Sequence, residues 1–169
     1  MILYIVRHSD AVPGGTPGIE DNERPLTEKG IKKMMEVARG LRRIGAVPEL
    51  VLSSPLPRAR GTAEIAVAEF GVRVPLNLTD TLAPTGTRTE FYRELRQHRR
   101  LAAIMIVGHM PSLGEIAGEI AWGSSDACLE FKKGGACALE ISRLEPVPTG
   151  TLLWLLPPAI LRDLGSGKE

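Results

Sequence analysis

The sequence predicts an α/β fold, a three-layer α/β/α sandwich around a mainly parallel sheet of about five to six strands with one antiparallel strand. Three observations support this class. Short apolar runs rich in β-branched residues alternate with amphipathic helical segments along most of the chain. Gly and Pro residues separate these segments. The last two apolar runs follow each other closely, which favours an antiparallel pair at the end of the sheet.

The first strand is predicted over residues 2–6, because β-branched and aromatic residues fill it and no charge interrupts them. A loop over residues 9–25 follows, with its Gly and Pro residues concentrated at 12–18, and such long loops beside a binding site are often functional. Thr27 is the predicted N-cap of a helix that ends near Gly45. The later elements are predicted as strands at 50–53, 72–76, 102–109, 135–142 and 151–157, and as helices at 58–70, 87–100 and 111–121.

A chain of 169 residues without an internal repeat has the length of one domain, predicted over residues 1–164 with a flexible tail at 165–169. Its net charge of +1 gives no overall attraction for nucleic acid or an anionic membrane. Cys128 and Cys137 are too few for a disulfide framework and are predicted to be free thiols. No apolar run approaches the roughly 20 residues of a spanning helix. The sequence therefore predicts a cytoplasmic protein with no nucleic-acid and no membrane partner.

Charged side chains stand where three of the predicted strands end. Arg7 and His8 follow the first strand, Arg58 begins a helix just after the second, and His109 ends the strand before residue 111. The carboxyl ends of parallel strands meet at one edge of a sheet, so we expect these residues to converge. Arginine forks and helix N-termini both suit phosphate. A surface or capping role for each residue alone is the alternative, and their recurrence at three exits weakens it.

His8 gives the predicted phosphate pocket a possible nucleophile. Near neutral pH an imidazole is often uncharged and can attack phosphorus through one ring nitrogen, provided that the other nitrogen donates to a fixed acceptor. His109 and the arginines would stabilise the transferring oxygens. Phosphoryl transfer needs mainly positioning and charge, and the sequence has only three histidines and no close His/Cys ligand pair. We therefore predict no metal and no cofactor.

Four segments in this order resemble the histidine phosphatase superfamily, also called the phosphoglycerate mutase-like fold: YIVRHSDA, RPLTEKG, VLSSPLPRARGTAE and IVGHMPSLGEIA. They are most similar to the small SixA-like phosphohistidine phosphatases of that family. The resemblance implies that His8 is a nucleophile that becomes phosphorylated, and that Arg7, Arg58 and His109 complete the phosphate pocket. It also implies a phosphoglycerate mutase-like fold, here without a cap domain, because RPLTEKG follows the loop almost at once.

The same resemblance places further residues beside the substrate. Arg24 matches a position near the substrate in SixA-like proteins, and Asp21 precedes it at a similar spacing. Ser9 replaces the usual glycine after the histidine, so we expect it to narrow the approach or add a hydroxyl to the site. Met110 is expected to line the site.

The acid that many relatives use as proton donor would fall in the segment TDTLAPTG. The aligned position is Thr81, so Asp80 beside it and Asp21 are the candidate proton donors. A leaving alkoxide needs such a proton, whereas the imidazole of phosphohistidine leaves readily once its nitrogen is protonated.

The sequence thus predicts a metal-independent phosphatase that acts on phosphohistidine of a protein partner. Two alternatives stay open. The first is a phosphatase for a small phosphorylated substrate, such as a sugar phosphate or another metabolite, with the same catalytic residues. The second is a non-catalytic phosphate-recognition module. Mutase activity is disfavoured, because it needs an enclosed site.

Overall fold

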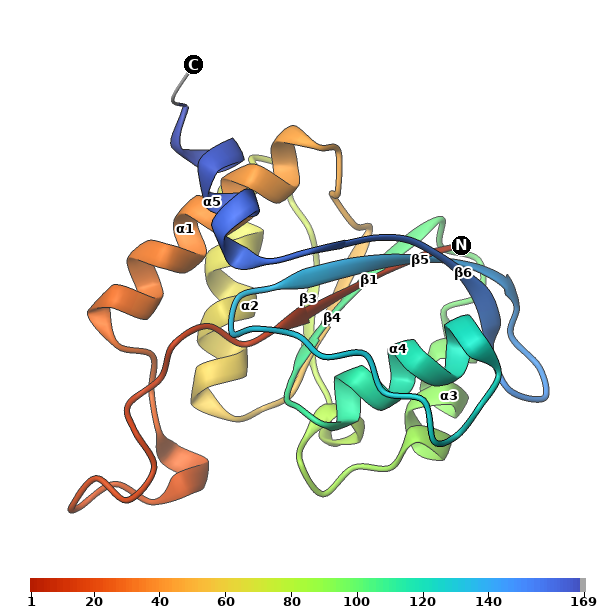
Figure 1. Ribbon diagram of the computed structural model, residues 1–169, viewed down its shortest axis with the longest axis horizontal. Coiled ribbons are helices and arrows are strands. Elements are labelled where there is room, and N and C mark those ends of the chain that lie inside the picture. The colour runs from red at the N-terminus through yellow and green to blue at the C-terminus, as the bar shows by residue number, and fades with distance from the viewer. Residues whose placement is uncertain (168–169) are drawn as a thin grey trace.

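A six-stranded sheet forms the middle of the protein, whose computed structural model describes residues 1–167 (Figure 1). The sheet order is β3-β2-β4-β1-β5-β6, and β3, β2, β4 and β1 run parallel to one another. β5 runs antiparallel to β1 and to β6, so among the described strands it alone runs against the others. The predicted mainly parallel sheet with one antiparallel strand is confirmed. The strands are β1 (Ile2–Arg7), β2 (Leu50–Ser53), β3 (Leu76–Leu78), β4 (Ala103–Gly108), β5 (Ala136–Arg143) and β6 (Thr149–Leu156).

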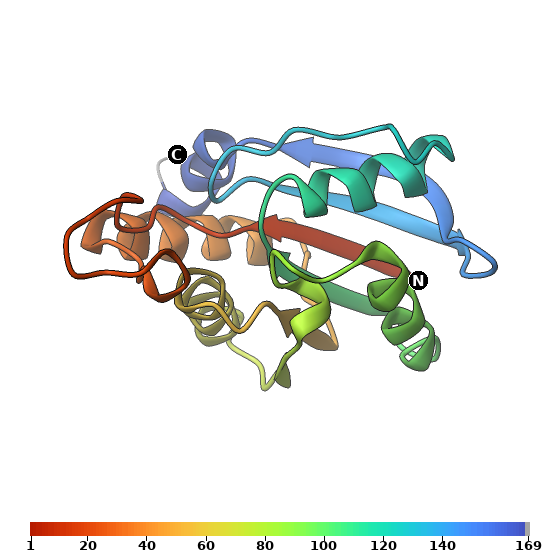
Figure 2. The same cartoon turned by 90° about the horizontal axis from the view of Figure 1, so that it is seen from below.

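Helices cover both faces of this sheet, which confirms the three-layer architecture (Figure 2). α1, α2 and α5 bury their apolar residues against one face, and α3 and α4 bury theirs against the other. Two short 3-10 helices, η1 and η2, lie in the connections. The bounds are η1 (Asp21–Glu23), α1 (Glu28–Arg43), α2 (Pro57–Glu69), η2 (Asp80–Leu82), α3 (Arg88–Gln97), α4 (Ser112–Trp122) and α5 (Pro158–Ser166).

The start of α1 is fixed by the residue that the sequence predicts. The Thr27 hydroxyl accepts a hydrogen bond from the Gly30 backbone N–H at 3.0 Å, which satisfies one of the free donors of the first turn. Gly30 has no room for a side chain, because a Cβ there would collide with the carbonyl oxygen of Asp10. The first turn of α1 is thereby pressed against the segment that leaves β1.

The packing of α5 on α1 also depends on glycine. A Cβ on Gly40 of α1 would collide with the Leu161 carbonyl oxygen, and a Cβ on Gly165 of α5 would collide with the Glu36 carbonyl oxygen. The two backbones approach closely enough for Leu161 to be fully buried against α1. α5 is therefore a packed part of the described structure.

Two elements differ from the sequence prediction. The third strand was expected at 72–76 but begins at Leu76, because Gly71 takes a φ of +71° and Pro75 has no N–H to donate to a ladder. α5 was not predicted, and it includes residues 165–166, which were assigned to a tail; residues 168–169 of that tail lie outside the described residues. The boundary of the domain stays a prediction. Among residues 1–167, no helix is both long and apolar enough to cross a membrane.

Candidate active site

The three strand exits lie side by side, as the sequence predicts. β1 and β4 pair with Arg7 opposite Gly108, and β2 pairs with β4 with Ser53 opposite Val107, so the strands end at the same level. The His8 N–H donates to the Gly108 carbonyl oxygen at 3.1 Å. The rings of His8 and His109 consequently lie 5.2 Å apart, centroid to centroid.

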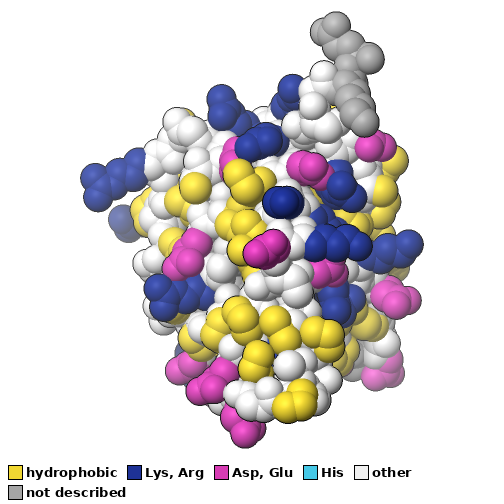
Figure 3. All heavy atoms as spheres, turned by 90° about the vertical axis from the view of Figure 1, so that its left-hand side faces the viewer, with side chains coloured by type: hydrophobic (Ala, Val, Ile, Leu, Met, Phe, Trp, Pro, Cys, Tyr) yellow, Lys and Arg dark blue, Asp and Glu magenta, His cyan; other side chains and the backbone are white. Residues whose placement is uncertain are grey.

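Both histidine rings are covered by the segments around them. Only 6% of His8 and 5% of His109 are exposed. Figure 3 shows the side of the molecule on the left of Figure 1, towards which β1 runs. Lys and Arg side chains are numerous on this side, and no histidine is visible. The two rings themselves are therefore largely removed from water.

His8 has the arrangement required of a nucleophile. Its Nδ1 lies 2.7 Å from the carbonyl oxygen of Ser9, and a carbonyl only accepts, so Nδ1 carries the hydrogen and Nε2 carries the lone pair. Burial lowers the pKa of His8 to about 4; the hydrogen bond to Ser9 opposes this shift, and the charges of Arg58 and Arg7 add to it. At neutral pH the ring is therefore uncharged, with Nε2 free to attack.

His109 is held from its other side. Its Nε2 lies 2.9 Å from the Ser54 hydroxyl oxygen, which also accepts from the Leu56 N–H at 3.3 Å. The Ser54 hydroxyl can therefore give its own hydrogen to Nε2, leaving a hydrogen on Nδ1 for an incoming oxygen. Burial lowers the pKa of His109 to about 3, with further contributions from His8 and Arg58.

Arg7 and Arg58 are each anchored by one nitrogen. Arg7 donates to the carbonyl oxygen of Phe131 at 2.6 Å, and Arg58 donates to that of Asp21 at 2.8 Å. Within residues 1–167, the buried side-chain nitrogens or oxygens without a hydrogen-bond partner are Arg7 Nε, Arg58 Nε and His109 Nδ1. All three belong to the predicted phosphate pocket. Buried polar groups are normally paired, so these atoms mark where an acceptor-rich ligand such as phosphate would bind.

The structure also brings Arg24 and Asp21 to this pocket. Arg24 Nε donates to Asp21 Oδ1 at 2.8 Å, and the other carboxylate oxygen lies 3.7 Å from the Arg58 guanidinium. η1 thus places a carboxylate between two arginines at the edge of the pocket. The role of either residue towards a substrate stays a prediction, as does Asp21 as proton donor.

Ser9 and Met110 do not have the expected places. Ser9 is fully buried, and its hydroxyl donates to the Gly30 carbonyl oxygen at 2.9 Å, so it binds α1 and adds no group to the pocket. The expectation that Ser9 adds a hydroxyl to the site is therefore wrong, whereas a narrowed approach to the site stays a prediction. Met110 packs on the apolar cluster under α3 and α4, with its terminal methyl against Gly114, so the structure gives it a packing position.

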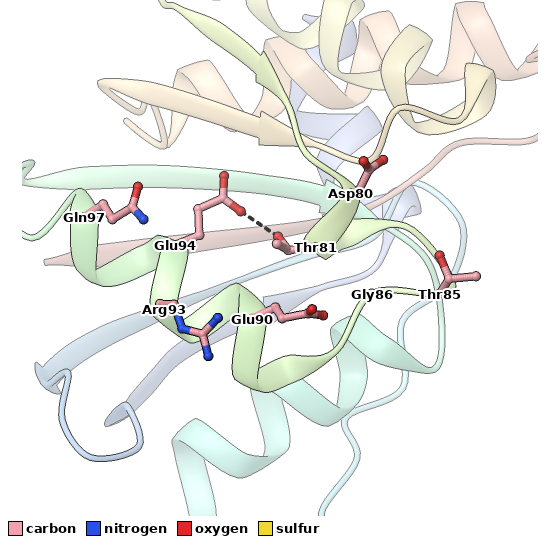
Figure 4. Close-up of a pocket in the computed structure, with 8 residues that line it drawn as sticks. All are labelled: Asp80, Thr81, Thr85, Gly86, Glu90, Arg93, Glu94 and Gln97. Atoms are coloured by element: carbon pink, nitrogen blue, oxygen red, sulfur yellow. Dashed lines mark hydrogen bonds between the residues drawn. The ribbon is translucent and has the colours of Figure 1, made fainter.

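Asp80 lies outside the histidine and arginine cluster in this structure. It is one of the residues around a groove of about 550 Å³ between η2 and α3, where its side chain points away from the carboxyl groups of Glu90 and Glu94 (Figure 4). Thr81 donates its hydroxyl to Glu94 Oε2 at 2.6 Å. The groove adjoins the strand exits, because the carbonyl oxygen of the next residue, Leu82, lies 3.3 Å from where a Cβ on Gly108 would stand. Asp80 as proton donor stays a prediction.

Two buried hydroxyls of the site were not predicted from the sequence. Ser54 contacts His109, and Thr62 accepts from the Ser9 N–H at 3.0 Å. Both stand in the VLSSPLPRARGTAE segment, one directly after β2 and the other a helical turn after Arg58. The sequence shows the spacing of Ser54 and Thr62 from Arg58, but it does not show that their hydroxyls are buried. Cys128 and Cys137 are free thiols, as predicted.

Known proteins are similar to this chain in sequence and in fold. The family model of the histidine phosphatase superfamily (branch 1) matches residues 3–85, which contain Arg7, His8 and Arg58. A curated but uncharacterised protein of Picosynechococcus sp. is 38% identical over 168 residues, covering 93% of this chain and 100% of the relative. This chain belongs to the histidine phosphatase superfamily. The family resemblance seen in the sequence is thereby confirmed.

Solved structures of several phosphatases share the fold of this superfamily member. The protein histidine phosphatase SixA, complexed with tungstate, superposes with a TM-score of 0.82 at 24% identity, covering 95% of this chain and 99% of SixA. The α-ribazole phosphatase of Shigella flexneri gives 0.73 at 17%, covering 94% and 97%. A phosphoserine phosphatase of Entamoeba histolytica gives 0.67 at 14%, covering 95% and 98%. The phosphoglycerate mutase-like fold is confirmed, and the substrates named for these proteins differ.

Proposed function

We propose that this protein is a phosphatase in which His8 takes the phosphoryl group, and that phosphohistidine on a protein partner is its preferred substrate. The observation that carries the proposal is the set of unpartnered buried nitrogens around the free Nε2 of His8, namely Arg7 Nε, Arg58 Nε and His109 Nδ1. Two arginines and a neutral imidazole donor suit the oxygens of a phosphoryl group. The arginines supply the positive charge that stabilises the negative charge of the transition state, so the steps need no metal ion.

The reaction takes place in two steps. In the first, the lone pair on His8 Nε2 attacks phosphorus, the phosphorus–nitrogen bond of the substrate breaks, and the leaving imidazole nitrogen takes a proton. In the second, the oxygen of a water molecule attacks the phosphorus of phospho-His8, and the bond between phosphorus and Nε2 breaks. The electron pair of that bond returns to Nε2, one proton of the water passes to solvent, and inorganic phosphate leaves. Arg7 and Arg58 hold the phosphoryl oxygens throughout, because their charges favour the developing negative charge.

The chemistry around the two histidines supports phosphohistidine as substrate. The rings of His8 and His109 hydrogen-bond to Ser9 and Ser54, and within residues 1–167 neither ring has a carboxyl group as its hydrogen-bond partner. The Asp21 carboxylate is bound by Arg24. An imidazole leaving group can take its proton from solvent, whereas an alkoxide depends on a placed acid. The SixA likeness supports the same substrate class.

Two other functions use the same residues. A phosphatase for small metabolites or sugar phosphates is favoured by the likeness to the α-ribazole and phosphoserine phosphatases, and Asp21 or Asp80 would then be the acid. A non-catalytic phosphate-recognition module would need the arginines, but it would gain nothing from an uncharged His8 whose Nε2 is left free.

A rapid-quench labelling experiment tests the proposal. Wild type, His8→Ala and the control His98→Ala, which removes a histidine at the end of α3, receive a protein whose phosphohistidine carries radioactive phosphate. We expect acid-labile label on wild type and on His98→Ala, none on His8→Ala, and free phosphate as product. We also expect phosphohistidine to be turned over at least about tenfold faster than phosphoserine or a sugar phosphate.

Each other outcome removes one part of the proposal. Faster turnover of the small monoesters would make the protein a small-molecule phosphatase. Binding without label or phosphate release would leave only the recognition module. Label on His8→Ala would show that another residue is the nucleophile.

A further inference from the structure

Thr62 joins the two elements that carry His8 and Arg58. Its hydroxyl donates to the Arg58 carbonyl oxygen at 2.7 Å within α2 and accepts from the Ser9 N–H at 3.0 Å. Thr62 and Ser9 are both fully buried, and Arg58 is 4% exposed. Solvent water is therefore kept from this link, and a single hydroxyl connects the end of β1 to the helix of Arg58.

The same link reaches the ring of His8 through Ser9. The N–H of Ser9 belongs to the peptide group that follows His8, and the carbonyl of Ser9 accepts the hydrogen on His8 Nδ1 at 2.7 Å. The Ser9 hydroxyl is bound to Gly30 of α1 at 2.9 Å. Ser9 is thus bound to α2 through its N–H and to α1 through its side chain. Its carbonyl in turn orients the ring of His8.

We infer that Thr62 is a positioning residue, which fixes Ser9 so that His8 keeps Nε2 free and directed at the phosphoryl group held by Arg58. The inference rests on the proposed function for its kinetic consequence. Thr62 itself touches no reacting atom. Its hydroxyl holds the N–H side of the peptide between His8 and Ser9 and ties that peptide to the turn of α2 from which Arg58 extends. The carbonyl side of the same peptide accepts from the Gly134 N–H at 3.2 Å.

Replacing the hydroxyl by a methyl group isolates this role. Thr62→Val keeps the volume and the branching of the side chain but leaves the buried Ser9 N–H without an acceptor. The peptide then keeps only its hydrogen bond to the Gly134 N–H, so we expect it to tilt about that bond and the Ser9 carbonyl to hold one tautomer of His8 less firmly. Misplacement of a reacting group by about 1 Å is enough to lower a rate about a hundredfold. Thr62→Ser keeps the hydroxyl and is the matched control.

The experiment combines a spectrum with a rate. Histidine labelled with ¹⁵N reports the tautomer of His8 directly, and we expect wild type and Thr62→Ser to show one species with hydrogen on Nδ1. Thr62→Val should show a mixture of tautomers. Rapid-quench labelling should show His8 phosphorylation slowed about ten- to a hundredfold in Thr62→Val, with little change in KM and with wild-type rates in Thr62→Ser.

The outcomes separate this inference from the proposed function. A folded Thr62→Val with the wild-type tautomer and phosphorylation rate would overturn the positioning role. An equal loss in Thr62→Ser and Thr62→Val would assign Thr62 to packing instead. If Thr62→Val does not fold, Thr62→Ala takes its place, with the same expectation against Thr62→Ser. If wild-type His8 is never phosphorylated, the proposed function fails, while the tautomer spectra still decide the role of Thr62.

Discussion

Two neighbouring regions differ in whether their polar side chains have hydrogen-bond partners. At the ends of β1, β2 and β4, His8, His109 and Arg58 are buried, and the cluster that they form with Arg7 keeps three nitrogens without a partner. In the groove between η2 and α3, Glu94 accepts hydrogen bonds from the hydroxyls of Thr79 and Thr81. Figure 4 shows the bond from Thr81. Glu90 in the same groove is bound by Thr87 as part of a capping box.

This difference distinguishes a candidate ligand-binding site, at the strand exits, from a groove on the surface. The groove has a volume of about 550 Å³, yet the acids named above are already hydrogen-bonded to the chain's own hydroxyls. The cluster at the strand exits keeps buried nitrogens without a hydrogen-bond partner, and that is the more specific sign of a ligand. The first region therefore fits the proposed phosphate pocket, whereas the acids of the second are used in contacts within the protein.

Removing the nucleophile should have the largest effect. His8→Asn keeps a polar side chain in the pocket but has no nitrogen able to attack phosphorus, so we expect turnover of phosphohistidine to fall at least about a thousandfold. Rapid-quench measurement of phosphate release checks this. Turnover within about tenfold of wild type would mean that the cluster binds phosphate without His8 attacking it.

Removing one arginine of the cluster should lower activity less than removing His8, but more than removing an arginine outside the cluster. Arg58→Ala deletes a phosphate donor whose Nε is unpartnered, and we expect kcat/KM to fall about a hundred- to a thousandfold. Arg60→Ala, on the same helix, removes an exposed side chain that pairs with Glu64 and should change kcat/KM less than about twofold. Equal effects of the two changes would contradict the role of Arg58 in the phosphate pocket. A thermal melt of each variant controls for folding.

The buried histidines predict a pH dependence of stability. Both have pKa values well below the value of about 6.5 expected when unfolded, so between about pH 6.5 and 4 the unfolded chain binds more protons. Their contribution is present above pH 6.5 and is lost as the pH falls, by about 1.4 kcal/mol of unfolding free energy per pH unit for each histidine. Urea unfolding from pH 7 to 4.5 should show a steeper decline for wild type than for His8→Asn combined with His109→Asn. Parallel curves would refute the burial argument.

The smallest effect is expected in the groove. Glu94→Ala removes the acceptor of the Thr79 and Thr81 hydroxyls, which costs about 1 kcal/mol of unfolding free energy, and it should leave phosphohistidine turnover within about twofold. Chemical unfolding and steady-state kinetics on the same sample measure both. A tenfold loss of turnover would instead make the groove part of the active site.

The residues that sequence reasoning placed correctly are those fixed by periodicity and strand ends. Arg7, His8, Arg58 and His109 each follow an apolar run, and aligned parallel strands necessarily bring such exits together. What escaped prediction depends on side-chain direction after the exit. Ser9 points to α1 because the missing Cβ of Gly30 lets that helix approach, and the distance between Ser9 and Gly30 along the chain hides this contact.

α5 shows a second limit of the sequence. Its apolar signal is short, Pro157 precedes it and Pro158 begins it, so the segment resembles the end of a strand followed by a tail. Pro158 in the first turn is in fact typical of a helix start. The helix is held by burial of Leu161 against α1, and that contact is set by tertiary packing rather than by local preference.

The glycine contact between α1 and α5 has a genetic consequence. Every side chain larger than hydrogen at Gly40 or Gly165 would collide with the backbone of the other helix. We therefore expect neither position to accept another residue, and a second substitution at one position cannot compensate for a substitution at the other. In a saturation library selected only for folded protein, both should return almost exclusively glycine. A survey of intolerant positions would then rank them beside His8 and Arg58, although they take no part in the chemistry. Selection for activity among variants already known to fold would tell the two kinds of constraint apart.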